Sequence, residues 1–402
     1  MSYETGTDSF LLDESVKVSA TGAPDWEDMT LRQERHLNSL LARRNAIVLS
    51  LLFITGFLIK VLPIMQYARV GGDPFLHYKF AVALLDGRLS VPVQVNGAST
   101  VVDLYYPPLF HLISLGFFLA FPTVDPYAIM KVLAVTFDSL QVVPLYFIVK
   151  RVTHSSPSAL LASYSLLSVR SDYQMLSWGG YANIAGLLFI CALAYSVMAD
   201  RPILSGIFTA AVALTHHLSF LLIATVLAAY YALVLYRKRT IPRTLVGITV
   251  GGAAAYLVFY RFAMFPIVDF YSKFSPTYNQ SLYVTPYILE QVGVLLILSA
   301  MLGIGAFFAW SGCKSVEGRE LLLIWAIVPV MLAYAYLFGA QWHGVRWIHF
   351  IPMPLTVWTG IGIGYLSTKR IVFLVFFVAF TIQLILTLQG YHLDILRNVA
   401  QP

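Results

Sequence analysis

One acidic segment stands directly after the first long apolar run: Gly71-Gly72-Asp73-Pro74-Phe75-Leu76-His77-Tyr78. A carboxylate at a membrane surface can remove a proton from an acceptor nucleophile or bind a cation. It can also cap a helix, because proline suits the first helical position and aspartate accepts an amide hydrogen. His77 follows Asp73 by one helical turn and could orient the carboxylate or the acceptor. Asp73 is therefore a candidate base, with His77 and Tyr78 as candidate substrate contacts.

Aromatic and amide residues recur in two later polar segments. Tyr105 and Tyr106 precede a pair of prolines and a short apolar stretch, where they either form an aromatic belt or line a cavity. Sugars present apolar ring faces to such side chains and hydroxyl groups to their polar tips. The segment Ser177-Trp178-Gly179-Gly180-Tyr181-Ala182-Asn183 adds Tyr181 and Asn183. Its glycines would let backbone approach a ligand closely, or would serve a tight loop leading into a membrane helix.

Cationic candidates lie at two other points of the chain. His216 and His217 are adjacent between two short apolar runs and must find water, phosphate or a partner. Arg346, close to His343, lies at the outer end of a predicted span, where the positive-inside trend predicts few basic residues. Its position therefore indicates an anionic partner. A phosphate suits a guanidinium fork, although an arginine reaching lipid headgroups is the alternative.

Two acids fall inside apolar runs, where an ionisable side chain is paired or functional. These are Asp138 and Glu290. Asp138 could make a buried contact with Gln141, and Glu290 is kept as a candidate substrate contact.

The elements that must position these residues are membrane helices. Of 402 residues, 58% are hydrophobic and 11% charged, and the mean hydropathy is +0.75. Soluble domains carry roughly a quarter charged residues, so lipid is the solvent here. The net charge of +6 sits in short clusters between apolar runs, which does not favour a nucleic-acid partner.

We predict an all-α, polytopic membrane protein with about eleven spans. The runs are 46–66, 127–149, 158–169, 181–198, 203–214, 218–235, 245–260, 287–310, 321–338, 347–366 and 371–388.

The stretch from Leu109 to Phe121 decides the topology, because counting it as a span inverts every later loop. It has only about 13 residues, which favours an interfacial or re-entrant helix. Excluding it places all the basic clusters on one side, which the positive-inside rule makes the cytoplasm. The candidate residues then face the extracytoplasmic side.

Domain boundaries follow from this topology. We expect a disordered cytoplasmic tail over 1–44, in which Asp25 to His36 could form a surface helix. A transmembrane domain follows over 45–390, with a large first outer loop over 67–126. A short outer tail covers 391–402.

The chain resembles the GT-C superfamily of membrane glycosyltransferases, which use lipid-phosphate-linked sugars. The segment from Gly72 to Tyr78 looks like the acidic motif of the oligosaccharyltransferase catalytic subunit and its archaeal relatives. Tyr106-Pro107-Pro108-Leu109 looks like the start of the second interfacial helix. The segment from Ser177 to Asn183 occupies the place of a second acidic motif, but the expected carboxylate pair is absent, leaving only Asp172 nearby.

The resemblance implies a cell-membrane enzyme that moves one sugar from a polyprenyl (dolichyl) phosphate carrier to a lipid, glycan or protein acceptor, with inversion. Smaller transferases that use dolichyl-phosphate mannose or aminoarabinose carriers are similar. Asp73 would be the base, while Arg346 and His217 would neutralise the departing phosphate. The resemblance leaves room for a divalent metal, Mg or Mn, without requiring one. The alternatives are a metal-dependent oligosaccharyltransferase-like enzyme and a transporter or flippase for a lipid-linked saccharide.

Overall fold

A computed structural model describes residues 26–94, 101–274, 284–309, 318–338, 344–366 and 370–399. The chain divides into two units, Met1–Ile47 and Val48–Pro402, and all the candidate residues belong to the second.

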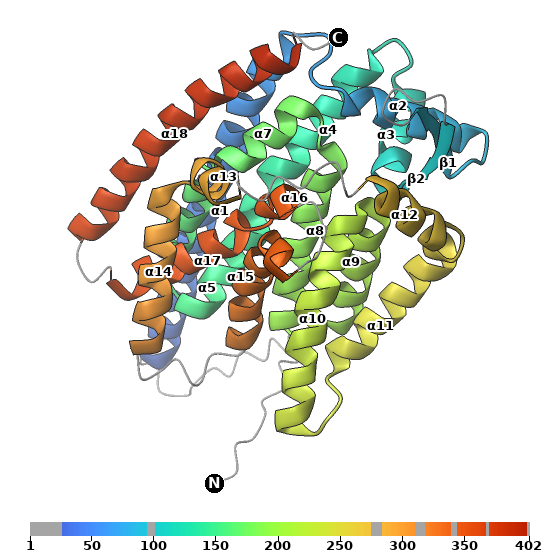
Figure 1. Cartoon of the computed structure of the whole chain (residues 1–402). Coiled ribbons are helices and arrows are strands. Elements are labelled where there is room, and N and C mark those ends of the chain that lie inside the picture. Colours follow the sequence, from blue (N-terminus) through green and yellow to red (C-terminus); the bar gives the residue numbers. More distant parts are fainter. Residues whose placement is uncertain are drawn as a thin grey trace. The chain divides into compact units, whose positions relative to one another are not determined.

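Helices make up most of the second unit (Figure 1). Those of the first half are α1 (Trp26–Met65), α2 (Asp73–Leu85), α3 (Leu109–Ala120), α4 (Pro126–Leu140), α5 (Val142–Thr153), α6 (Ser156–Leu166), α7 (Arg170–Trp178), α8 (Tyr181–Met198) and α9 (Pro202–Thr215). Those of the second half are α10 (His217–Lys238), α11 (Arg243–Ala255), the π-helical turn η1 (Tyr256–Tyr260), α12 (Arg261–Phe274), α13 (Val284–Val292), α14 (Val294–Ala309), α15 (Arg319–Ala333), the 3-10 turn η5 (Ala335–Phe338), α16 (Gly344–Ile348), α17 (Pro352–Leu366) and α18 (Arg370–Val399).

The membrane character predicted from the sequence is confirmed. Within the described residues, six helical segments are long and apolar enough to cross a bilayer. They are Ser39–Met65, Pro126–Thr153, Tyr181–Met198, His217–Lys238, Arg243–Asp269 and Arg370–Val399. A seventh results if α13 and α14, which meet at an 86° bend, form one span. The other expected spans correspond to helices of 11 to 15 residues, so the count of eleven stays a prediction.

The first and last helices extend past the expected spans. α1 begins at Trp26, inside the region expected to be a tail, and runs on without a break to Met65. α18 continues to Val399 and lies against α7 (Figure 1). Its Tyr391 hydroxyl donates to the carbonyl oxygen of Lys60 at 3.1 Å, and Asn398 donates to Ser177 Oγ at 3.1 Å. The end of α18 therefore supports the helix that leads into the Trp178-Gly179-Gly180 segment.

The segment between α2 and α3 contains one feature absent from the all-helical expectation. Strands β1 (Ser90–Gln94) and β2 (Val101–Tyr105) form an antiparallel hairpin with Val91 opposite Leu104. These two side chains are buried together with Phe80 and Ala83 of α2. The hairpin thus covers one face of α2 and leads the chain into Tyr106.

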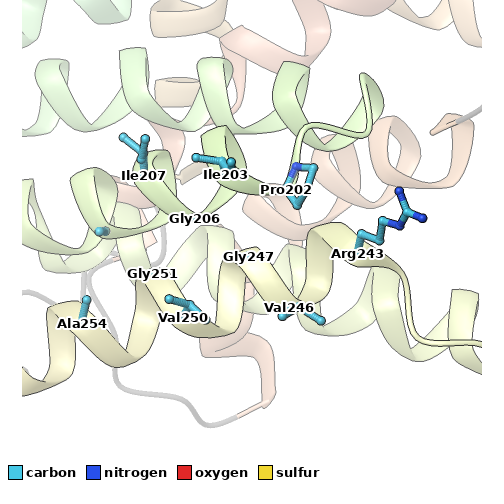
Figure 2. Close-up of a pocket in the computed structure, with 11 residues that line it drawn as sticks. Pro202, Ile203, Gly206, Ile207, Arg243, Val246, Gly247, Val250, Gly251 and Ala254 are labelled. Atoms are coloured by element: carbon cyan, nitrogen blue, oxygen red, sulfur yellow. The ribbon is translucent and has the colours of Figure 1, made fainter. Parts of the chain in front are cut away.

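Helices α9 and α11 pack backbone to backbone (Figure 2). A Cβ atom at Gly247 would lie 2.0 Å from the carbonyl oxygen of Pro202, and one at Gly251 equally close to that of Gly206. Small residues allow such close approach between membrane helices. The open apolar groove between them has a volume of about 690 Å³ and is lined from Pro202 to Ala254, away from the end of α9 that joins His216.

Candidate active site

Five segments distant in the sequence meet at one end of the second unit. They are the start of α2, the residues before and within the first turn of α3, the α7–α8 turn, the α9–α10 junction and α16. The glycine, ring and cation contacts described below join them. Each segment carries at least one residue predicted from the sequence.

Asp73 is the first residue of α2 and is half-buried. The helix N-cap is Gly72, and no side chain caps the helix start, so the capping role considered for Asp73 is wrong. Burial raises the pKa of Asp73 above its ordinary value, and the positive charge of Arg346 opposes this by lowering it. The carboxylate therefore does not cap the helix, and the guanidinium of Arg346 is near enough to affect its pKa.

The segments that contain Gly71-Gly72 and Gly179-Gly180 pack closely against each other. Gly71 has a φ of +77°, and a Cβ atom there would lie 2.4 Å from the carbonyl oxygen of Trp178. Gly179 has a φ of +95°, and its Cβ would lie 2.3 Å from Cδ of Pro74. Only glycine readily adopts a left-handed backbone conformation where there is no room for a Cβ atom. The α7–α8 turn is thus held against the residues that flank Asp73.

His77 occupies a buried position one turn after Asp73. Its Nδ1 lies 2.9 Å from Nε2 of His111, and its Nε2 lies 3.1 Å from the carbonyl oxygen of Gly179. His111 Nδ1 in turn lies 3.2 Å from the carbonyl oxygen of Pro107. Burial lowers the pKa of His77 to about 4 and holds that of His111 well below its ordinary value. The ring nitrogens of His77 contact His111 and the Gly179 carbonyl rather than Asp73, so His77 links α2 to the α3 and α7–α8 segments.

Tyrosine rings form the wall of the site. The Tyr106 ring lies 5.6 Å from that of His77, 6.0 Å from that of His216 and 5.3 Å from that of His217. The Tyr181 ring stacks on His77 at 6.1 Å. Its hydroxyl is buried with no hydrogen-bond partner in the described part of the chain. Both tyrosine rings therefore contact the histidine cluster, and the lining of a cavity by Tyr106 stays a prediction.

His216 and Asn183 belong to a hydrogen-bonded chain behind this wall. His216 is the N-cap of α10, and its Nδ1 accepts from the backbone amide of Ser219 at 3.2 Å. The Ser219 hydroxyl donates to Oδ1 of Asn183 at 3.2 Å, and Asn183 donates to the sulfur of Met175 at 3.1 Å. Burial lowers the pKa of His216 well below its ordinary value. This ordered chain presents His217 beside Tyr106.

Arg346 comes from α16 and completes the site. Its guanidinium lies 4.9 Å from the centre of the Trp178 ring, a cation–π contact. His349, one turn later, lies 6.1 Å from the same ring and 2.8 Å from the Ser171 hydroxyl. Arg346 is exposed, so the contact with Trp178 sets its direction while leaving it free to meet an anion.

Three other predicted residues do not join the cluster, and one cannot be assessed. Tyr78 packs against Phe118 and Tyr127, with ring centres at 6.1 and 5.6 Å. Tyr105 ends β2 opposite Ser90. Glu290 forms an ion pair with Arg170 at 3.1 Å, on α7. His343 lies outside the described residues.

The buried acids form a separate group. Asp138 pairs with Lys60 across α1 and α4, and Gln141 donates to it at 3.4 Å. Asp172 lies within the field of this pair; burial and the Asp138 charge raise its pKa well above its ordinary value. Within the described residues no group of three or more His, Cys, Asp or Glu side chains is arranged to hold a metal ion.

Some residues of the site were missed in the sequence. His111 and Trp178 were seen only as neighbours of other motifs, and His349 was not considered. For His349 a signal was present, since it follows Arg346 at helical spacing. The pairing of His77 with His111 spans 34 residues and is a product of the fold.

Comparisons with known proteins identify the fold. No family model matches the sequence, and no curated protein matches it. Among solved structures, ArnT from Cupriavidus metallidurans bound to undecaprenyl phosphate is similar, with 13% identity and a TM-score of 0.54 over 85% of this chain and 63% of that chain. The archaeal oligosaccharyltransferase AglB from Archaeoglobus fulgidus, in complex with an inhibitory peptide and a dolichol-phosphate, has 12% identity and a TM-score of 0.51 over 87% of this chain and 55% of that chain.

A second structure of the Archaeoglobus fulgidus oligosaccharyltransferase, tethered to an acceptor peptide containing the NVT sequon, has a TM-score of 0.50 at 13% identity, covering 87% of this chain and 55% of that chain. The chain thus spans less than two thirds of the length of these proteins. The similarity extends over most of the membrane helices described here. The chain has the fold of these ArnT and oligosaccharyltransferase structures, as its resemblance to the GT-C superfamily implies.

Proposed function

We propose that the protein transfers a sugar from a polyprenyl phosphate carrier to an acceptor at the extracytoplasmic face. The observation that carries the proposal is that Asp73 serves no capping role and that exposed Arg346 is near enough for its positive charge to lower the pKa of Asp73. A base and an anion-binding group are the two functions such a transfer requires. The GT-C fold shared with ArnT and AglB, whose structures contain undecaprenyl phosphate and dolichol-phosphate, supports the same donor class.

In this mechanism Asp73 accepts the proton of the acceptor hydroxyl as its oxygen attacks the anomeric carbon. The bond from that carbon to the phosphate oxygen breaks, and its electron pair leaves with the lipid phosphate. Arg346 and His217 meet the charge that develops there. Attack opposite the leaving group inverts the anomeric carbon. Tyr106 and Tyr181 would contact the faces of the sugar, and the acceptor is a lipid, glycan or protein.

Two alternatives receive less support from the geometry. A metal-dependent reaction needs several ligands, and Asp172 belongs to the group of Lys60 and Asp138 rather than to that of Asp73. A transporter was suggested by Asp138 and Glu290. Both acids are ion-paired within the protein, which accounts for them without a transport path.

The test is incubation of the purified protein with radiolabelled polyprenyl-phosphate sugars and a membrane extract. Asp73→Asn keeps the size of the side chain and removes the base, so we expect labelled product to disappear while donor binding persists. Asp86→Asn is the matched control, since Asp86 caps the other end of α2, is exposed and pairs with Arg88. Normal turnover by Asp73→Asn would eliminate the base assignment. No product from any donor with the wild type would remove the transferase proposal.

A further inference from the structure

The contacts of the His77–His111 pair can be compared with the number of ring protons available to form hydrogen bonds. Three contacts run in a row: Gly179 carbonyl to His77 Nε2 at 3.1 Å, His77 Nδ1 to His111 Nε2 at 2.9 Å, and His111 Nδ1 to the Pro107 carbonyl at 3.2 Å. Each carbonyl oxygen can only accept. Each of the three contacts therefore needs one ring proton to be a hydrogen bond.

Two neutral imidazoles carry one ring proton each. A neutral pair can satisfy only two of the three contacts, and in the third a nitrogen lone pair faces another acceptor. One additional proton, shared between the rings, satisfies all three and gives the pair a charge of +1. The geometry is thus that of an imidazole–imidazolium pair, held by backbone carbonyl oxygens at both ends.

Desolvation opposes that charge in the protein itself. His77 and His111 are 3% and 1% exposed, and burial lowers both pKa values. The groups that face the pair are Asp73 on its own helix, Tyr106 and Tyr181 on the two sides, and His216, His217 and Arg346 beyond. Asp73 and Arg346 offset each other, which leaves no net anion to stabilise a further proton. An anion arriving in the site changes this balance.

We propose that the His77–His111 pair takes up one proton when an anionic phosphodiester binds beside Arg346. The ligand supplies the negative charge. The third ring proton then turns the one contact that lacks a proton into a hydrogen bond. The inference rests on the proposed function, because it assumes that the site accepts a lipid phosphodiester. The inference adds a role for His111 that the transfer chemistry does not by itself require. His111 does not contact the reacting atoms and is therefore a positioning residue.

Proton uptake has a mechanical consequence. The three bonds join α2, the first turn of α3 and the α7–α8 turn, which carries Trp178 beneath Arg346. Completing all three when the donor arrives would stiffen the site around it. By reciprocity, raising the pH weakens donor binding as much as donor binding favours the proton.

The experiment is calorimetric titration of the detergent-solubilised protein with a short polyprenyl methyl phosphodiester. This probe has no group that titrates near neutral pH, so any proton exchanged belongs to the protein. Measuring the binding enthalpy at one pH in two buffers of different ionisation enthalpy gives the number of protons taken up. We expect about half to one proton per ligand, and an affinity that falls up to about tenfold per pH unit on the alkaline side.

His111→Gln keeps a hydrogen-bonding side chain but removes the second ring, and it should abolish uptake. His392→Gln, an exposed histidine on α18, should retain it. Binding without buffer dependence in the wild type refutes the inference directly, even if His111→Gln does not fold. Uptake that persists in folded His111→Gln assigns the proton elsewhere and also refutes it. Absence of probe binding contradicts the proposed donor instead, which separates the two failures.

Discussion

The left-handed turn at Gly179 provides the sharpest test of how this site is built. Replacement by alanine requires a side chain at a φ of +95°, which costs about 1–2 kcal/mol. The new Cβ would also lie 2.3 Å from Cδ of Pro74, and relieving such overpacking costs about 1–3 kcal/mol. We expect Gly179→Ala to lower the free energy of unfolding by about 2 to 5 kcal/mol.

Gly87 supplies a matched control. It also has a positive φ, +68°, but nothing lies within 4 Å of its would-be Cβ. Gly87→Ala should therefore lose only the backbone part, about 1–2 kcal/mol. Titration with SDS in mixed micelles, followed by circular dichroism, measures both variants.

The two variants should also differ in function. The Gly179 carbonyl accepts from His77, so displacing it should weaken binding of the phosphodiester probe, while Gly87→Ala should leave binding unchanged. Equal losses of stability in the two variants would refute the close packing of the α7–α8 turn on Pro74. Unchanged probe affinity in folded Gly179→Ala would refute the link from that turn to the site.

Two further predictions concern charges. Lys60→Met removes the cation that pairs with buried Asp138, and we expect a loss of about 3–5 kcal/mol in the same micelle titration. Adding Asp138→Leu should recover most of it, and no recovery would contradict the pairing. Transfer should decline as the pH falls through the raised pKa of Asp73, since only the carboxylate accepts a proton. Arg346→Gln removes the charge that lowers this pKa, so the acidic limb of kcat/KM should move to higher pH; an unmoved limb would place Arg346 too far away to act.

Local chemistry made several features of the site predictable. Asp73 and the histidines of the α9–α10 junction stand out because ionisable groups beside apolar runs need a reason to be there. Gly179 and Gly180 were recognised as a place of close approach. In the structure the group that approaches Gly179 is Pro74, whereas the sequence left open a ligand or a tight loop.

Tertiary pairing was beyond the sequence. Asp138 makes the expected contact with Gln141, but its main partner is Lys60, 78 residues away. Glu290 finds Arg170 on α7, and Arg170 also reaches Asp394 of α18 at 3.3 Å. The packing of the helices against one another decides these partners. Helical periodicity within one segment does not predict which helices will be neighbours. The hairpin β1–β2 was missed for a related reason, since Val91 and Leu104 are buried by α2 rather than by their own strands.

The prediction that the stretch from Leu109 to Phe121 does not cross the membrane can be argued from the site itself. α3 has 12 residues and extends about 18 Å. If α4 with α5 crosses once and α6 crosses back, as the expected spans require, a crossing at α3 would put the start of α2 on the opposite face from the α7–α8 turn, yet Gly179 packs against Pro74.

The ring of Tyr106, before α3, likewise lies 5.3 Å from that of His217, after it. Both contacts require one membrane face for the whole site. α10 begins at His217 in that site and has Arg237 and Lys238 in its last turn. Because basic residues mark the cytoplasmic end of a span, the positive-inside rule predicts that the site faces the extracytoplasmic side, where a lipid-linked donor would meet its acceptor.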